Sequence, residues 1–94
     1  MKIMWLKRAI NQQQEAIDYI AQQNPYSALN ILDRVIKATE LLENYTQMGR
    51  NGRVKGTREL VIDKTPFILV YRIQNDRIEI LNFLHYAQQW PPLE

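Results

Sequence analysis

GTRELVIDKTPFILVYRI, residues 56–73, and RIEILNFLHYAQQW, residues 77–90, decide the fold of this chain. Both stretches are rich in β-branched and aromatic residues, which favour strands, and polar residues that break strands flank each apolar run. Pro66 stands where a strand would begin, the position at which its missing N–H does least harm. The pattern predicts two strands closed by a tight connection and a third strand that runs into a short tail.

Two arginines within these predicted strands need an explanation. Side chains alternate along a strand, so Arg58 shares a face with Leu60, and Arg72 shares a face with Val70. Each arginine therefore places a charge on an otherwise apolar face. Two interpretations remain open at this stage. The arginines either hold a phosphate or an acidic stretch of a partner, or they pair with a nearby carboxylate: Glu59, Asp63 or Glu79.

The residues before these strands predict a helical hairpin. Apolar residues recur at helical spacing over about Leu6–Gln23 and again over about Tyr26–Tyr45. Asn24 fits the cap of the second helix, and Pro25 fits its first turn. Lys2–Trp5 is either an edge strand or the lead-in to the first helix. Helices followed by strands indicate the α+β class. We expect a short N-terminal strand and a two-helix antiparallel hairpin packed on a three- to four-stranded, mainly antiparallel sheet.

Length and composition limit the class of protein. At 94 residues with 46% hydrophobic content, the chain fits one small domain over residues 1–94 with a single core. The absence of cysteine excludes a disulfide framework and suits the cytosol. Apolar runs are short and the first residues lack the core of a signal peptide. The sequence therefore predicts a cytoplasmic protein without a membrane span.

Positive charge is concentrated in one segment. The net charge is only +2, but Arg50, Arg53, Lys55 and Arg58 fall within nine residues that contain no acid. A basic cluster of this kind favours a phosphate backbone or an acidic protein segment, and the alternative is a solvated loop. The surrounding Gln47–Lys55 has two glycines and no periodicity, which predicts an exposed loop.

Motifs of phosphate loops, zinc proteases, redox pairs and serine hydrolases are absent. A single histidine, His85, cannot build a histidine-rich metal site, so we expect neither metal nor cofactor. The groups that the sheet could bring together suit RNA cleavage, which needs a base, an acid and cations around the phosphate. These groups are Lys55, Arg58, Arg72, His85 and Tyr86.

The structural alternative for the end of the chain is packing. A histidine followed by tyrosine at the end of a strand often packs or caps that strand, which would make His85 and Tyr86 structural. Trp90, beside Pro91, is expected to pack back on the sheet rather than to stack on a base.

The order of the elements resembles the RelE/ParE superfamily of toxins from bacterial type II toxin–antitoxin modules. The resemblance covers nearly the whole chain. It is strongest in these stretches: Gly56–Leu60, Phe67–Arg72, Ile78–Leu81, Leu84–His85 and Gln89–Pro91. It implies a compact toxin that a cognate antitoxin wraps in a hetero-oligomer, with a segment that folds on binding. RelE-like members cleave mRNA on the ribosome, whereas ParE-like members poison DNA gyrase without known nuclease chemistry.

The chain departs from the RelE pattern where nuclease activity would lie. Glu59 and Val61 stand where RelE-type toxins use lysines, and Ile68 stands where they place an arginine. His85–Tyr86 only loosely resembles the ending of YoeB-like nucleases. The resemblance therefore favours gyrase over the ribosome as the target, and a non-toxic interaction domain is a third hypothesis.

The hypotheses assign different roles to the same residues. For a nuclease the catalytic candidates are Arg58 and Arg72 on the phosphate, with His85 or Tyr86 in proton transfer. For a protein that binds a target without chemistry, the contact residues are Arg50, Arg53, Lys55, Arg58 and Trp90.

Overall fold

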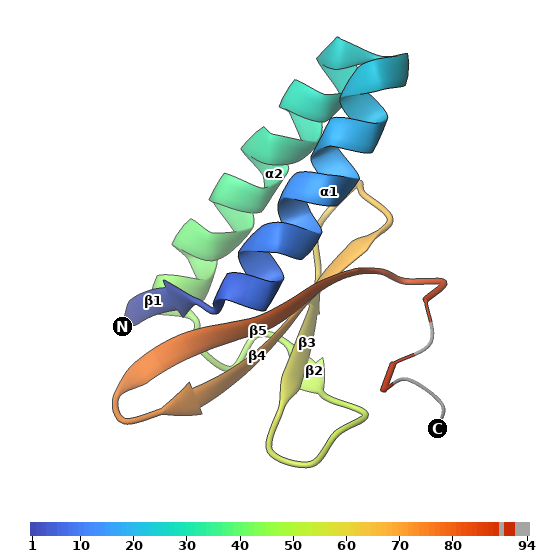
Figure 1. Cartoon of the computed structure of the whole chain (residues 1–94). Helices are drawn as coiled ribbons and strands as arrows, with labels where there is room; N and C mark the ends of the chain where they lie inside the picture. The colour runs from blue at the N-terminus through green and yellow to red at the C-terminus, as the bar shows by residue number, and fades with distance from the viewer. Residues whose placement is uncertain (89, 92–94) are drawn as a thin grey trace.

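The computed structural model describes residues 1–88, 90 and 91. Two helices lie side by side against one face of a five-stranded sheet, and their joined ends project past it (Figure 1). The α+β prediction is confirmed. The elements in chain order are β1 (Lys2–Trp5), α1 (Lys7–Gln23), α2 (Pro25–Asn44), β2 (Arg50–Asn51), β3 (Arg58–Val61), β4 (Phe67–Gln74) and β5 (Arg77–His85).

The turn between the helices forms as the sequence predicts. The Asn24 side chain accepts a hydrogen bond from the Ser27 backbone N–H at 3.2 Å, and Pro25 is the first residue of α2. Such a cap satisfies one of the backbone donors that a helix start leaves unpaired. A single residue therefore ends α1 and begins α2, which holds the two helices antiparallel. No helix of the described residues is long and apolar enough to cross a membrane.

The strand order in the sheet is β1-β5-β4-β3-β2. β1 is an edge strand that runs parallel to β5, with Lys2 opposite Arg77, and all other neighbours are antiparallel. The sheet has one strand more than the three to four expected. The additional strand is β2, two residues within the segment predicted as a loop, which pairs with the start of β3.

A bulge interrupts the pairing of β4 with β5. Val70 lies opposite Asn82 while Tyr71 lies opposite Ile80, so Leu81 is an extra residue in β5. The extra residue changes the alternation of side chains along β5. Ile80 and Phe83 consequently both point toward the helices, although they are three residues apart.

Each face of the sheet carries an apolar cluster. The larger cluster fills the space beneath the helices and includes Leu42, Leu69 and Ile80, all completely buried. The smaller one lies on the opposite side, which we call the outer face, and consists of Ile68, Val70, Leu81 and Leu84, against which Leu6 and Trp90 pack. The predicted packing of Trp90 on the sheet is confirmed.

Candidate functional site

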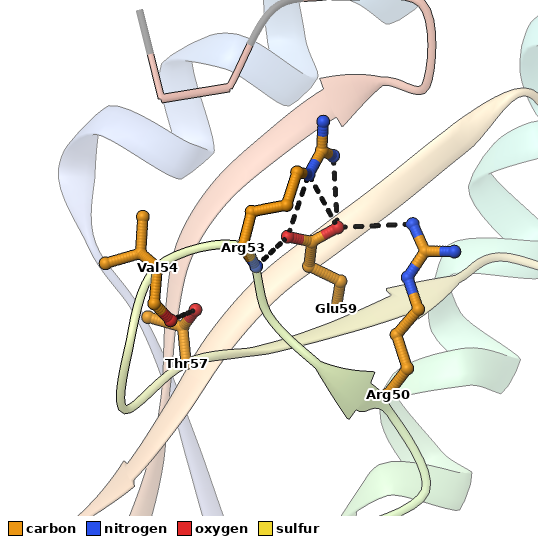
Figure 2. Close-up of polar contacts among 5 residues, drawn as sticks. All are labelled: Arg50, Arg53, Val54, Thr57 and Glu59. Atoms are coloured by element: carbon orange, nitrogen blue, oxygen red, sulfur yellow. Dashed lines mark hydrogen bonds and ion pairs between the residues drawn. The ribbon is translucent and has the colours of Figure 1, made fainter.

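The basic segment is folded around one buried carboxylate, Glu59 of β3 (Figure 2). Arg53 donates to it through Nε and Nη2 at 3.0–3.3 Å, and its backbone N–H donates at 2.9 Å. Arg50 of β2 adds a bond from Nη2 at 3.2 Å. Burial by itself raises the pKa of Glu59, but the bonds from Arg53 and Arg50 outweigh it, so the pKa lies below its ordinary value.

This cluster explains why the basic segment has a defined shape. Glu59 holds both arginines against β3. Thr57 closes the turn that precedes β3: its hydroxyl donates to the Val54 carbonyl, and its own carbonyl accepts the Gly52 N–H at 2.8 Å. The arginine side chains remain 61% and 42% exposed. Two cations on one carboxylate leave one positive charge in surplus, with guanidinium N–H groups still free to bind an anion.

Arg58 has a different environment, on the face of the sheet beneath the helices. Its guanidinium donates to the carbonyl of Gly49 at 2.7 Å and to that of Gln47 at 3.3 Å. The neighbouring Tyr71 hydroxyl accepts the Gly49 N–H at 3.0 Å and donates to the Thr46 carbonyl at 2.8 Å. Burial raises the pKa of Tyr71 above its ordinary value. Arg58 and Tyr71 together hold the chain that leaves α2.

Arg72 lies on the outer face and pairs with Glu79, one of the three carboxylates that the sequence left open as partners of the strand arginines. Its Nε is 2.7 Å from the Glu79 carboxylate, and Arg77 approaches the other oxygen at 2.8 Å. Only 5% of the Glu79 side chain is exposed. The hydrogen bond from Arg72, followed by that from Arg77, lowers the pKa of Glu79 below its ordinary value. This cluster therefore repeats the two-arginine arrangement around Glu59.

His85 ends β5 opposite Phe67 and contacts aromatic rings on two sides. Its ring meets Phe67 edge-on with 5.7 Å between centroids and stacks on Tyr86 at 4.8 Å. Nδ1 accepts the Ala87 backbone N–H at 3.1 Å. The imidazole thus packs and caps the end of the strand, which is the structural alternative that the sequence offered, and Tyr86 is left 65% exposed.

The proposed nuclease residues do not converge on one point. Arg58 is opposite Tyr71, whereas His85 is opposite Phe67, four residues and about 13 Å further along β4. Arg58 and Arg72 project from opposite faces of the sheet. Lys55 is exposed at the loop tip and has no hydrogen bond or ion pair with the described residues.

A groove on the outer face does bring some predicted residues together. It measures about 560 Å³, and its lining includes Arg50, Arg53 and Tyr86 beside the apolar Val61 and Ile68. Guanidinium groups there can bind an anion while the exposed ring offers an apolar contact. Sequence reasoning named all three polar residues. It offered Glu59 only as a partner for Arg58 or Arg72, whereas Glu59 binds Arg50 and Arg53 and positions them. The feature of the sequence that could have indicated this role is that Glu59 is the first acid after the cations Arg50 to Arg58. No group of three or more metal-ligating side chains occurs in the described part of the chain.

Comparison with known proteins decides the family. A family model described as "ParE toxin of type II toxin-antitoxin system, parDE" matches residues 3–90. The chain belongs to the ParE toxin family. This agrees with the resemblance seen in the sequence and with its preference for the ParE branch. The chain is thus a toxin of the type II toxin–antitoxin class.

Relatives of this ParE-family chain agree in sequence and in fold. It is 41% identical over 90 residues to "Putative toxin Y4kP" of Sinorhizobium fredii, a match that covers 96% of this chain and 93% of that protein. It superposes with a TM-score of 0.81 on a solved structure described as "Chromosomal ParDE TA system from P. aeruginosa", covering 90% of this chain and 95% of that one. At 23% identity, this second likeness shows the shared fold.

Proposed function

We propose that this ParE-family toxin inhibits growth by binding DNA gyrase and that an antitoxin encoded beside it neutralises it. We prefer binding to RNA cleavage because the candidate nuclease residues lie far apart. His85 lies about 13 Å along the sheet from Arg58, and Arg72 faces the other way. General acid–base catalysis needs its groups within hydrogen-bond reach of the same reacting atoms. Target binding needs only an exposed complementary surface.

The surface that fits this role is the outer-face groove together with the adjacent basic segment, residues 50–58. Arg50 and Arg53 are half-exposed and already aligned by Glu59, and Lys55 projects from the adjacent loop. Arginines aligned in advance lose less side-chain freedom when they bind, which favours affinity. Trp90 packs against the apolar cluster of the same face. These residues are therefore the proposed contacts, and an anionic surface of the target is their expected partner.

The first test is induced expression without antitoxin, with DNA and protein synthesis followed in parallel by pulse labelling. We expect DNA synthesis to stop first. Purified protein, added to gyrase and plasmid DNA, should then trap gyrase on DNA that it has cleaved. If translation stops first with mRNA cut on ribosomes, the toxin is a nuclease and the gyrase proposal fails. Normal growth would instead indicate a non-toxic interaction domain.

Three variants sharpen the test. His85→Ala should leave toxicity unchanged, because the imidazole has a packing role at an exposed strand end. Lys55→Glu should weaken toxicity, because it reverses a charge at the proposed contact. Lys7→Glu makes the same change in net charge at an exposed position of α1 and should have no effect. Loss of toxicity in His85→Ala, with unchanged stability, would contradict the binding mechanism.

A further inference from the structure

The outer face of the sheet presents cations to solvent. Both helices pack on the opposite face, so neither of them covers it (Figure 1). Ile3 and Trp5 of β1 pack toward the helices, so the alternate residue Lys2 lies on the outer face, in register with Arg77. The cations of this face are Lys2, Arg50, Arg53, Arg72 and Arg77.

The acids of the outer-face strands are buried. They are Glu59 and Glu79, whose side chains are 1% and 5% exposed. The exposed carboxylates of the described chain lie on the two helices and in turns, at Asp63 and Asp76. The charge of the molecule is therefore divided between its sides, with the positive charge on the uncovered face of the sheet.

The arginines of this face are held in place but keep unused donors. In the Glu79 cluster (Glu79, Arg72 and Arg77), Arg72 donates only through Nε, and Arg77 through Nε and Nη2. In the Glu59 cluster (Glu59, Arg50 and Arg53), Arg50 donates only through Nη2. The other N–H groups of these three arginines have no partner among the described residues. Each carboxylate neutralises one of its two arginines, so each cluster keeps a positive charge and donors that an anion can accept.

The spacing of the two clusters fits an anion that repeats. Glu59 lies opposite Val70, and Glu79 lies opposite Arg72, two residues further along β4. With about 4.8 Å between strands and about 3.3 Å per residue, the Cα atoms of the two glutamates are about 12 Å apart. Each strand of a DNA duplex carries one phosphate per about 3.4 Å of helix axis. The two clusters would therefore contact different phosphates of one polyanion.

Little apolar surface is exposed between the clusters. The side chains of the apolar cluster there are at most 8% exposed: Ile68, Val70, Leu81 and Leu84. Val61 and Tyr86 are exposed, but both lie at one end, in the groove beside Arg53. Protein–protein interfaces bury an apolar centre, whereas protein–DNA interfaces are more polar and much more positively charged. The outer face therefore favours a nucleic-acid backbone over an acidic protein segment.

We propose that the outer face binds the phosphate backbone of DNA, with the Glu59 cluster on one phosphate and the Glu79 cluster on another. The toxin then contacts the DNA that gyrase holds as well as the enzyme. The link to gyrase rests on the proposed function, whereas the DNA contact rests on the charge, the spacing and the small apolar surface between the clusters. Contacts to phosphates carry no sequence information, so binding is independent of the DNA sequence.

The test is fluorescence anisotropy of a labelled DNA duplex of about 20 base pairs with the purified full chain, without gyrase. The logarithm of the binding constant should fall with the logarithm of the salt concentration with a slope of about −1.8 or steeper, because each neutralised phosphate contributes about −0.9. A duplex RNA of the same sequence and a polyglutamate peptide are the comparison probes. Tighter binding to either of them, or no DNA binding up to about 100 μM protein in low salt, would overturn the proposal.

Two variants remove the surplus charge without stranding a carboxylate. Arg50→Gln leaves Glu59 with Arg53, and Arg77→Gln leaves Glu79 with Arg72. Each should weaken DNA binding roughly tenfold in low salt and make the slope shallower by about 0.9. Lys37→Gln makes the same change in net charge at an exposed position of α2 and should alter neither quantity. Urea denaturation confirms that each variant is folded. Equal losses in all three would show attraction by net charge alone and would overturn the proposal.

Gyrase trapping separates this proposal from the proposed function. If the chain traps gyrase on cleaved DNA but does not bind the duplex alone, the DNA contact is overturned and the proposed function stands. If the chain binds the duplex but leaves gyrase unaffected, the proposed function fails and the DNA contact stands.

Discussion

The two faces of the sheet bury polar groups in different ways. Beneath the helices, Tyr71 and Arg58 bond to main-chain groups of the segment that follows α2. On the outer face, Glu59 and Glu79 are buried as carboxylates, each between two arginines. The first arrangement fixes the course of the chain. The second also leaves a positive charge in surplus at each cluster, on a surface that solvent and partners can reach.

This difference gives the outer face its binding character. Its apolar cluster is small and lies between two cationic clusters, whereas the core beneath the helices is large and closed. A buried carboxylate needs its arginines, and the arginines keep their outer N–H groups available. We therefore expect substitutions beneath the helices to change stability most, and substitutions on the outer face to change stability less and binding more.

The largest expected effect separates the two apolar clusters directly. Leu69→Ala and Leu84→Ala delete the same atoms from opposite faces, at positions that are 0% and 6% exposed. We expect a loss in the free energy of unfolding of about 4 kcal/mol for Leu69→Ala and about 2 kcal/mol for Leu84→Ala, because a small cluster at the surface can close around the cavity. Urea denaturation measures both. Equal losses would show that the two clusters are equally rigid.

A smaller effect is expected at Tyr71. Tyr71→Phe keeps the ring but removes both hydrogen bonds of the hydroxyl, to Gly49 and Thr46, and should cost about 2 kcal/mol. The Gly49 amide should then exchange faster with solvent, which NMR can follow. Tyr86→Phe is the matched control at a 65% exposed ring and should change neither quantity. Unchanged protection of Gly49 would mean that Arg58 alone holds this segment.

The smallest effect is expected at Glu59 and depends on pH. Because its folded-state pKa is lowered from 4.5, Glu59 contributes stability above that pH and loses the contribution as the pH falls through the folded value. Glu59→Gln should therefore cost about 1 kcal/mol at pH 7, a modest value because both arginines remain partly solvated. Chemical denaturation at pH 7 and pH 3 tests this. The difference between variant and parent should shrink at pH 3, and a constant difference would exclude ion pairing as its cause.

The sequence predicts the elements better than the contacts between them. Helical spacing places α1 and α2 within one or two residues of their ends, and β-branched residues locate β4 and β5. β2 escaped prediction because Arg50–Asn51 has no strand-forming residue. Its pairing with β3 accompanies the bond from Arg50 to Glu59. The bulge at Leu81 was equally hidden, because it depends on how two strands meet and not on the residues of either one.

The same limit applies to the candidate site. Sequence spacing correctly offered Glu79 as a partner for Arg72, since the two residues flank one hairpin. It could not show that Arg58 and Arg72 face opposite sides, because the parity of each strand relative to the helices is set by tertiary packing. The proximity of Tyr86 to Arg50 and Arg53 depends on the return of the chain after β5, which no local pattern encodes.

The pairing of β1 with β5 has a consequence for how the protein folds during synthesis. Lys2 lies opposite Arg77, so β1 cannot pair until β5, the last strand of the sheet to be synthesised, is available. Pairing between residues so distant in sequence closes a long loop and forms slowly. The helices can form early, but a chain released before β5 lacks the strand that joins β1 to β4, so β1 has no partner and the core beneath the helices is incomplete. Prematurely terminated copies of this toxin should therefore be unfolded and harmless to the cell that makes them.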